Sequence, residues 1–448
     1  MTYQTQKPGQ TALKTGVTTE PPNTKIDTTI KTYTVNVFFD GTRNNLYNSE
    51  TKRLGKAGKL TDNVSHDNYY SNIALMYLAM DMSRPNIYKI YVEGSGSGSD
   101  QEDDMEGLGM ALGWTGRARR ITYTIEALEK IRKTLGNPPY SSIVLNVFGF
   151  SRGAAWARHF CYKIKNDAEK KHATINFVGI LDTVSSDDFK HYNDVAEMGL
   201  DIGKPQQINR IIHLTAQNDY REHFPLTPLK TACKEKIGDR FIGFECSLPG
   251  AHSDIGGGYS EVYPEYKEIR PLAPGKGYID YQWFIRKGYY AEGQYKTDFV
   301  TQTIWGKRKV RFLYQFICFE ILRDIAYEKS QYSPVSNYAT ISREAMQKLQ
   351  KYIDEMKKHQ VLGKFYKKCN DYIMQNYEKG GGGYTVPLLD NNSMKAIYNN
   401  FIHNSLEYSG IANVSGAKIL TEKSLNIGGE NIVSTEPMRP MVTEGFRT

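Results

Sequence analysis

Short apolar runs rich in β-branched residues recur along the first 265 residues, and segments of helix length separate most of them. Such runs are typical of strands buried on both faces of a parallel sheet, with crossover helices between them. We therefore expect an α/β fold with a mostly parallel central sheet. The runs lie at 32–39, 87–92, 143–148, 175–181, 211–216 and 241–246.

Apolar residues at helical spacing predict two longer helices. The first spans 120–135, and the second spans 345–377 and stops at the glycines 380–383. Tyrosine and lysine become frequent after residue 265, just before this second helix. Its candidate core positions are Met346, Leu349, Ile353, Met356 and Leu362.

These changes of pattern divide the chain into four parts. Residues 1–31, rich in Thr, Gln, Pro and Lys, are expected to form a flexible N-terminal tail. Residues 32–265 contain the predicted sheet, and 266–410 form a mainly helical addition. Residues 411–448 lack a strong pattern and are expected to trail over the surface as a C-terminal tail.

Composition excludes several classes of protein. The net charge of +8 is spread over 448 residues without a dense basic block, so we expect no nucleic-acid partner. The five cysteines are scattered and odd in number, which argues against a disulfide framework and a zinc site. The sequence contains no apolar run of about 18 residues, so we expect no membrane span. The N-terminus lacks the apolar core of a signal peptide, so we expect synthesis in the cytoplasm.

The most informative segment is Gly-Phe-Ser-Arg-Gly at 149–153, which directly follows a predicted strand and opens an alanine-rich helix. A serine between strand and helix in a Gly-x-Ser-x-Gly turn is typical of a nucleophile elbow. The strained turn needs small neighbours two residues on either side of the serine. Gly149 and Gly153 meet this need, so Ser151 is the candidate nucleophile.

A serine nucleophile needs a base, and the base needs an acid that orients it. His252 follows the strand at 241–246 within a glycine-rich segment and is the preferred base, with His403 as its rival. For the acid, Asp182 and Asp219 each follow a predicted strand. Spacing alone does not choose between them, and Asp219 could instead pair with the neighbouring Arg221.

The transition state also needs two N–H donors for its oxyanion. The N–H of Arg152, directly after the nucleophile, is one candidate, and the loop at Gly41 and Thr42 supplies the other. The acidic run at Asp100, Glu102, Asp103 and Asp104 lacks the spacing of a calcium-binding loop, so we expect neither a metal nor a cofactor there.

Four motifs that occur in order give the sequence a family resemblance. The first of these motifs contains the Gly41 loop and the second the Ser151 elbow. The chain resembles an α/β-hydrolase family that includes the first family of type VI secretion lipase effectors, and the resemblance spans about 33–260. The motifs are Phe-Asp-Gly-Thr-Arg-Asn at 39–44, Gly-Phe-Ser-Arg-Gly-Ala at 149–154, Leu-Asp-Thr-Val at 181–184 and Gly-Ala-His-Ser-Asp-Ile-Gly-Gly-Gly-Tyr at 250–259.

The resemblance implies an activity and a set of residues. It implies a phospholipase of A1 or A2 type that acts on glycerophospholipid membranes, with Ser151 as nucleophile, Asp182 as acid and His252 as base. The family often has Trp before Asp-Thr-Val, whereas Leu181 stands here. We further expect the tyrosine-rich region after residue 265 to act as an apolar lid.

The resemblance also implies a biological setting. The chain would be an antibacterial toxin delivered by a type VI secretion system into the target-cell periplasm. Its partners would be a secretion spike protein and a cognate immunity protein. Two alternatives stay open: an esterase or acyltransferase acting on small soluble esters, and a non-catalytic interaction module on a hydrolase fold.

Overall fold

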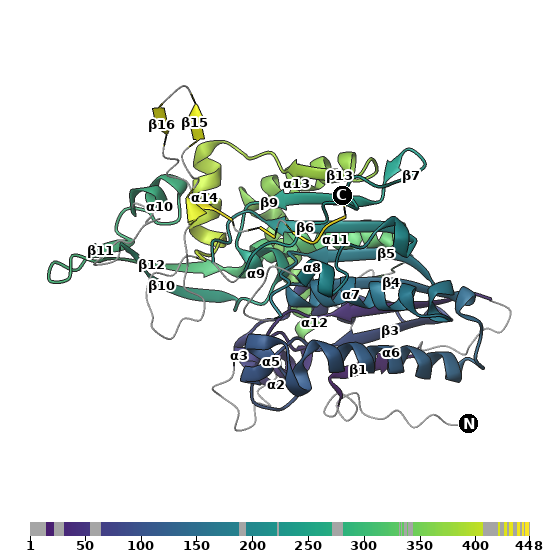
Figure 1. Ribbon diagram of the computed structural model, residues 1–448. Coiled ribbons are helices and arrows are strands. Elements are labelled where there is room, and N and C mark those ends of the chain that lie inside the picture. Colours follow the sequence, from purple (N-terminus) through teal and green to yellow (C-terminus); the bar gives the residue numbers. More distant parts are fainter. Residues whose placement is uncertain are drawn as a thin grey trace.

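The computed structural model (Figure 1) describes most of the chain. The long described segments are 15–21, 31–53, 64–187, 194–221, 224–270, 281–330 and 344–405. The short ones are 332, 334–335, 338, 420–421, 425–427, 430–432, 437–439, 441–442 and 444–447.

An eight-stranded sheet runs through the centre of the molecule. Its strand order is β1-β3-β2-β4-β5-β6-β9-β13, and every neighbouring pair is parallel except β1 with β3. The predicted parallel sheet is therefore confirmed. In spatial order the strands are β1 (Val17–Glu20), β3 (Ile87–Val92), β2 (Tyr33–Phe39), β4 (Ile143–Phe150), β5 (Thr174–Leu181), β6 (Ile208–Ala216), β9 (Gly243–Leu248) and β13 (Gly381–Thr385).

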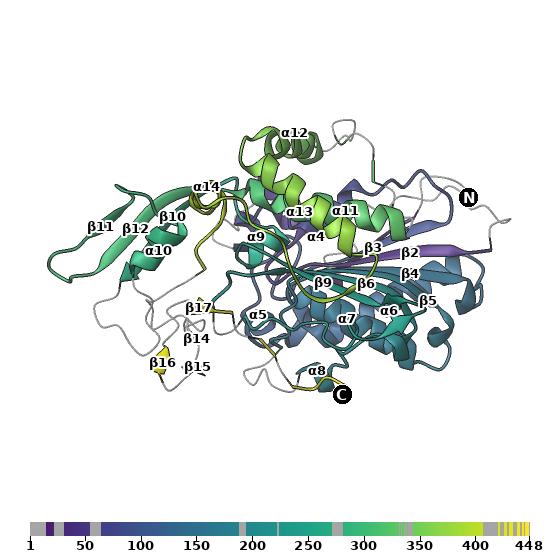
Figure 2. The ribbon, with the colours of Figure 1, turned by 90° about the horizontal axis from the view of Figure 1, so that it is seen from above.

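Helices cover both faces of this sheet, as Figure 2 shows. One face carries α6 (Arg117–Thr134) and α7 (Arg152–Asn166), and the other carries α4 (Asn72–Ala79) and α11 (Gln315–Ser330). The side chains of successive strand residues point to opposite faces and so belong to two different hydrophobic cores. Val147 of β4 belongs to the core under α7, while Phe148 belongs to the core under α11.

The region after residue 260 is a mixed addition that begins with a small sheet. Three antiparallel strands, in the order β10 (Val262–Arg270), β12 (Ile304–Arg311) and β11 (Tyr295–Thr297), project to one side of the main sheet (Figure 1). The predicted helices lie between β10 and β11 and after β12. The helices of this region are α10 (Tyr281–Lys287), α11, α12 (Glu344–Lys358), α13 (Leu362–Asn376) and α14 (Asn391–Phe401).

The single long helix predicted over 345–377 is wrong, because the chain turns between α12 and α13. A Cβ on Gly363 would lie 2.1 Å from the carbonyl oxygen of Lys357, so the turn brings backbone too close for any side chain. The five predicted core positions are nevertheless all buried. Apolar spacing thus located the buried face but did not reveal the turn.

Two edge strands were also missed by the sequence pattern. β1 falls within the predicted N-terminal tail, where it pairs with β3 and its Glu20 forms an ion pair with Lys89. β13 begins in the glycine run expected only to end a helix, and it adds a parallel strand beside β9. Neither segment has the apolar alternation of a half-buried strand.

The remaining elements are short. The helices are α2 (Leu46–Arg53), α3 (Val64–Asp67), α5 (Met105–Met110), α8 (Asp194–Glu197) and α9 (His252–Gly256). The strands are β7 (Lys236–Ile237), β8 (Arg240–Phe241), β14 (Leu420–Thr421), β15 (Leu425–Ile427), β16 (Glu430–Ile432) and β17 (Pro437–Met438). Single-turn helices lie at Gly113–Thr115, Tyr140–Ser142, Lys170–His172, Lys204–Gln206 and Phe312–Tyr314. Within the described ranges, no helix is long and apolar enough to cross the membrane.

Candidate active site

Ser151 occupies a sharp turn between β4 and α7. Its backbone angles, φ 60° and ψ −129°, are strained for a residue with a side chain. A Cβ on Gly153 would lie 2.3 Å from the carbonyl oxygen of Asp40, and one on Gly149 would lie 2.6 Å from that of Gly153. Both glycines are therefore required sterically, as expected for a nucleophile elbow.

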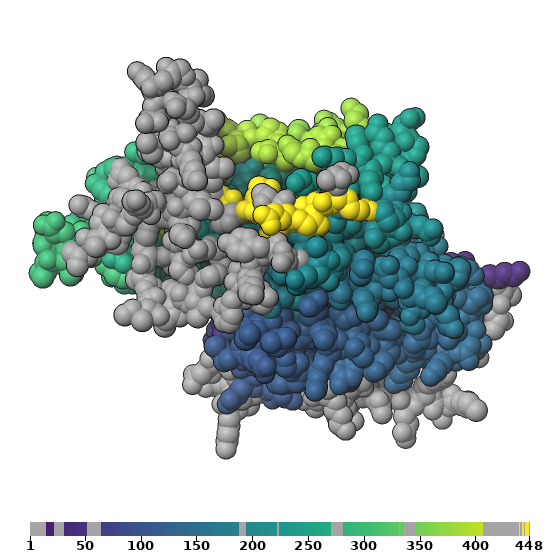
Figure 3. Space-filling model, in the orientation of Figure 1, coloured from purple at the N-terminus to yellow at the C-terminus, as the bar shows by residue number. Residues whose placement is uncertain are grey.

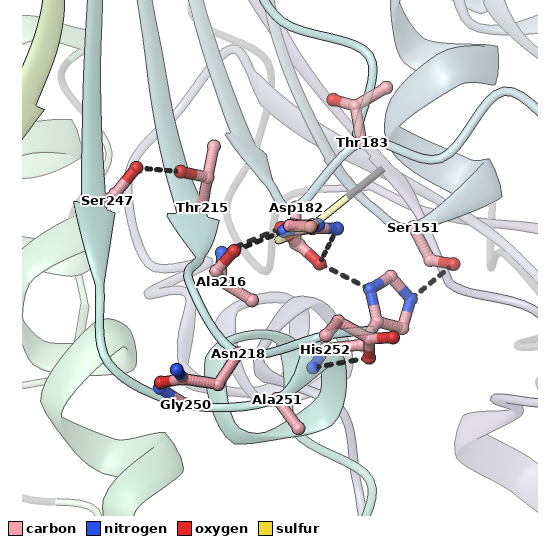
Figure 4. Close-up of polar contacts among 12 residues, drawn as sticks. Ser151, Asp182, Thr183, Thr215, Ala216, Asn218, Ser247, Gly250, Ala251 and His252 are labelled. Atoms are coloured by element: carbon pink, nitrogen blue, oxygen red, sulfur yellow. Dashed lines mark hydrogen bonds and ion pairs between the residues drawn. The ribbon is translucent and has the colours of Figure 1, made fainter. Parts of the chain in front are cut away.

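Ser151, His252 and Asp182 form a continuous chain of hydrogen bonds (Figure 4). Ser151 Oγ lies 2.7 Å from His252 Nε2, and His252 Nδ1 lies 2.5 Å from Asp182 Oδ2. The three residues follow β4, β9 and β5, so they meet at the carboxyl edge of the parallel sheet. Because a carboxylate only accepts, His252 Nδ1 carries the proton and Nε2 accepts the hydrogen bond of the Ser151 hydroxyl.

The electrostatics of the site favour a neutral imidazole and an ionised acid. Burial lowers the pKa of His252, and the hydrogen bond and charge of Asp182 only partly oppose this. Burial alone would raise the pKa of Asp182, but the charge of Arg439 and the contacts with His252 and Arg439 hold that pKa well below its usual range. At neutral pH, His252 is therefore ready to accept a proton.

Arg439 joins this site from the far end of the chain. Its Nη2 lies 2.8 Å from Asp182 Oδ2, and its Nη1 contacts both Asp182 Oδ1 and the carbonyl oxygen of Ala216. The C-terminal segment that carries it, yellow in Figure 3, lies across the surface of the sheet-containing core. Nothing in the sequence marks Arg439 as part of a site, because it is a single arginine in a segment without a pattern.

A second buried pair, His213 and Glu245, stabilises the turn that carries Asp182. Asp182 has a positive φ of 44°, and the N–H of Thr183 donates to His213 Nε2 at 3.0 Å. His213 Nδ1 lies 2.9 Å from the carboxylate of Glu245. The backbone N–H of Ala216 also donates to Asp182 Oδ1 at 2.7 Å. Asp182 is thus fixed by the neighbouring strand β6, whose His213 is held in turn by Glu245 of β9.

Asp219, the alternative acid, contacts the backbone of His252 and not its imidazole. Arg221 binds both of its carboxylate oxygens, at 3.0 and 2.7 Å. Asp219 Oδ2 also accepts the backbone N–H of His252 at 3.0 Å. It therefore contacts the main chain of the base, while Asp182 contacts its imidazole.

His403, the rival base, belongs to a different buried pair. Its Nδ1 lies 2.6 Å from Asp254 Oδ1, and its N–H donates to Asp254 Oδ2 at 3.0 Å. Asp254 Oδ2 in turn accepts the N–H of Ala251, directly before His252. His403 thus contacts the segment around His252 only through Asp254. The imidazole that is bonded to Ser151 is that of His252.

The loop after β2 approaches the elbow from the other side. Buried Asp40 accepts hydrogen bonds from Gly41 N–H at 2.8 Å, Ser71 Oγ at 2.5 Å and the Tyr91 hydroxyl at 2.6 Å. The N–H of Gly41 is therefore already bonded to Asp40, so Thr42 is the better candidate in this loop for the expected oxyanion donor. Across the described residues Thr42 N–H has no acceptor, and Arg152, first in α7, has an N–H without a partner inside the helix.

The acidic run at 100–104 is used for local structure. Asp104 caps α5 through the N–H of Glu106 and accepts the Thr115 hydroxyl at 2.7 Å. Asp103 lies 3.6 Å from Arg43. Over the part of the chain that the structure describes, no three His, Cys, Asp or Glu residues are grouped to hold a metal ion.

The comparison with protein families decides the resemblance. Residues 159–272 match the model of the catalytic domain of Tle1-like type VI secretion phospholipase effectors. The family resemblance is confirmed. The matched segment contains Asp182 and His252, and it begins shortly after Ser151.

One solved structure extends the likeness in fold. The structure of the Tle1 effector bound to the VgrG spike of the type 6 secretion system covers 95% of this chain and 93% of that chain, with 18% identity and a TM-score of 0.51. An uncharacterized protein from Pseudomonas aeruginosa covers 75% of this chain and 52% of that chain, with 18% identity and a TM-score of 0.40. No curated protein matches the chain.

Proposed function

We propose that this Tle1-like chain is a serine esterase of phospholipase A type that cleaves acyl esters of glycerophospholipids. The observation that carries the proposal is the hydrogen-bonded chain from Ser151 through His252 to Asp182 at the carboxyl edge of the sheet. That arrangement is the one used for acyl transfer by serine hydrolases. The family match at 159–272 supports a phospholipid as the substrate.

In the proposed mechanism, Ser151 Oγ attacks the ester carbonyl while His252 Nε2 takes its proton. Asp182 stabilises the resulting imidazolium, which then protonates the departing lysolipid oxygen. The acyl group remains on Ser151 until a water, activated by His252, releases it as a fatty acid. The N–H groups of Arg152 and Thr42, neither of which has an acceptor among the residues that the structure describes, are assigned to the oxyanion, and the Gly41 backbone shapes their loop.

The proposed lipid interface is the tip of the small sheet, which belongs to the tyrosine-rich region after residue 265; a lid formed by that region stays a prediction. Phe299 and Val300, which follow β11, are 90% and 93% exposed. Exposed apolar side chains on a projecting hairpin would enter the interfacial region of a bilayer. Replacing both by serine should weaken hydrolysis of vesicles while leaving cleavage of a soluble short-chain ester unchanged.

We infer that the protein is an antibacterial toxin that a type VI system delivers into the target-cell periplasm. The fold of the Tle1 effector, which was solved bound to a VgrG spike, supports a spike protein as partner. A toxin that attacks the producer's own lipids also requires a cognate immunity protein. Co-purification with the spike and with a protective neighbouring protein would test these partners.

The central experiment compares wild type with Ser151→Ala on phospholipid liposomes, with fatty acid and lysolipid both quantified. Wild type should release both products, and the alanine variant neither. Release by the variant at the wild-type rate would contradict the assignment of Ser151. Equal rates on micelles and on monomeric esters would favour the alternative of a soluble-ester hydrolase, and a Ser151 that does not react with a fluorophosphonate would favour a non-catalytic module.

A further inference from the structure

His213 of β6 is a buried histidine that lies outside the proposed catalytic residues but repeats the geometry of their base. Its side chain is 0% exposed, and its Nδ1 lies 2.9 Å from Glu245 Oε2. Its Nε2 lies 3.0 Å from the backbone nitrogen of Thr183, which donates to it. Because a carboxylate only accepts and an amide N–H only donates, His213 carries its proton on Nδ1 and accepts at Nε2. His252 has the same tautomer, with Asp182 in the place of Glu245.

The backbone turn at Asp182 shows why this acceptor is needed. The N–H of Asp182 still donates to the carbonyl oxygen of Leu214 at 2.8 Å, as the ladder between β5 and β6 requires. The positive φ of 44° at Asp182 then turns the chain, and the N–H of buried Thr183 points to a side chain of β6 instead of its backbone. A buried N–H without an acceptor is costly, so His213 stabilises the turned backbone relative to a relaxed one.

Glu245 fixes the orientation of His213. The two residues are direct partners in the parallel pairing of β6 with β9. Glu245 Oε2 also accepts the N–H of Leu229 at 2.8 Å, so two donors from different segments hold the carboxylate. The hydrogen bonds thus run from β9 through His213 of β6 to the turn after β5, in the order of these strands in the sheet.

The direction of the Asp182 carboxylate depends on that turn. Its Oδ2 lies 2.5 Å from His252 Nδ1, while its Oδ1 accepts the N–H of Ala216 at 2.7 Å. Both contacts require the side chain to leave the backbone in one direction, and a change in φ at Asp182 would swing the carboxylate away from the imidazole. A misplacement of about 1 Å in a catalytic constellation can cost on the order of 100-fold in rate.

We propose that His213 is a positioning residue of the proposed esterase. By accepting the N–H of Thr183, it keeps the carboxylate of Asp182 against the imidazole of the base. Since an amide N–H does not give up its proton, His213 moves no proton and acts only through Asp182. Glu245 acts one step further away, by holding His213 in the accepting tautomer. This inference rests on the proposed function, and it concerns how the acid of that same site is aimed.

Two substitutions at His213 test the role of its acceptor. The side-chain oxygen of glutamine can reach the position of Nε2 and accept the Thr183 N–H, whereas leucine fills the site without an acceptor. On a soluble nitrophenyl ester, His213→Leu should lower kcat about 10–100-fold with KM nearly unchanged, because only the acid is misaligned. His213→Gln should stay within about fivefold of wild type, the worth of the hydrogen bond it loses to Glu245. Equal losses in the two variants would overturn the proposal.

The pH profile gives a readout that lost packing alone would not move. Burial lowers the pKa of His252, and the hydrogen bond and charge of Asp182 oppose this. The charges of Arg221 and Asp219 also act on that pKa, in opposite directions, and both stay in the variant. In His213→Leu the misdirected carboxylate opposes burial less, so the pKa falls further. Because the base must be neutral, the acid limb of kcat/KM should move to lower pH. A limb at the wild-type position, combined with a reduced kcat, would contradict positioning through the acid.

A double variant separates positioning from a general loss of stability. If His213 acts only through the acid, His213→Leu should cost little more once Asp182→Asn has removed that acid. A general defect of folding would instead multiply the two losses, and that result would overturn the proposal.

Thr215→Val is the matched control. Thr215 lies two residues after His213 on the same face of β6, and its hydroxyl lies 2.8 Å from that of Ser247 on β9 (Figure 4). The substitution removes a buried polar pair across the same two strands and should leave kcat and the acid limb at their wild-type values. A loss of kcat as large as that of His213→Leu would overturn the proposal. Failure of the proposed function is distinct, because wild type itself would then cleave no ester and would not react with a fluorophosphonate.

Discussion

The guanidinium of Arg439 and the carboxylate of Asp182 form a buried, two-pronged ion pair although 257 residues separate them in the chain. Asp182 therefore divides its charge between Arg439 and the imidazole of His252. This sharing reduces the charge of Asp182 that acts on the imidazole of His252.

Removing Arg439 should change the pH profile in a defined direction. In Arg439→Gln the whole charge of Asp182 acts on His252, which raises the pKa of the imidazole. Since the base must be neutral, activity is lost as pH falls through that pKa. The acid limb of kcat/KM against pH should therefore move to higher pH, whereas in wild type burial lowers the pKa of His252 below 6.5.

Arg447→Gln controls for loosening of the C-terminal segment. Arg447 also anchors this segment, through Asp201 at 3.1 Å, but it does not contact Asp182. Its acid limb should coincide with that of wild type. If both variants moved the limb equally, the cause would be displacement of the segment instead of the charge of Arg439.

Replacing each of the two candidate acids should reduce kcat by a different factor. Asp182→Asn removes the group that fixes the tautomer of His252, and kcat should fall on the order of 10⁴-fold. Asp219→Asn weakens the hydrogen bond to the main chain of His252 and removes the charge that pairs with Arg221. Because Asp182 still contacts the imidazole, the loss should stay within about 10–100-fold. Initial rates on a soluble ester measure both. A larger loss for Asp219→Asn would reverse the assignment.

Gly153→Ala should destabilise the fold as well as the site. The added Cβ would lie 2.3 Å from the carbonyl oxygen of Asp40, so α7 and the loop after β2 must separate. The free energy of unfolding, measured in urea, should drop by about 1–3 kcal/mol. Gly109→Ala in α5 is the control, because its Cβ would meet nothing within 4 Å. That change should be neutral or stabilise by up to about 1 kcal/mol.

Asp40 should make stability depend on pH between about 4 and 6. Burial raises the pKa of Asp40 from 3.8 to about 6, although Ser71, Tyr91 and the Gly41 N–H oppose this. As pH rises through this window the unfolded chain releases the proton first, so the free energy of unfolding falls, by at most about 3 kcal/mol. Above pH 6 this contribution is constant.

Asp40→Asn isolates that contribution. The amide does not titrate, so its unfolding free energy relative to wild type should increase between pH 4 and pH 6 and level off above. Urea denaturation of both proteins across this range measures the difference. A difference that does not vary with pH would show that Asp40 keeps an ordinary pKa in the folded protein.

The sequence was most informative where one local requirement decides the structure. The strand, Gly149, Ser151, Gly153 and helix form a contiguous unit, and the structure reproduces it. Strand ends also predicted that Asp182 and His252 would lie at one edge of the sheet, because parallel strands place their carboxyl ends together. Spacing could not rank Asp182 above Asp219, since both follow neighbouring strands and the choice depends on side-chain direction.

Long-range contacts were beyond reach. Nothing local to Arg439 marks it as a partner of Asp182, and nothing in the glycine run at 380–383 shows that a free sheet edge beside β9 awaits it. The acceptor of Gly41 N–H was missed for a different reason. Asp40 turns its own carboxylate onto the next residue, a local contact that depends on burial by Ser71 and Tyr91 from distant segments.

The position of Arg439 has a consequence for synthesis. Ser151, Asp182 and His252 leave the ribosome long before it, so a nascent or C-terminally shortened chain could assemble the catalytic groups with the charge of Asp182 uncompensated. Such a chain would hold the proton on His252 more strongly and work only at higher pH. We therefore expect the contact of Arg439 with Asp182 to set the pH range in which the proposed catalytic groups work.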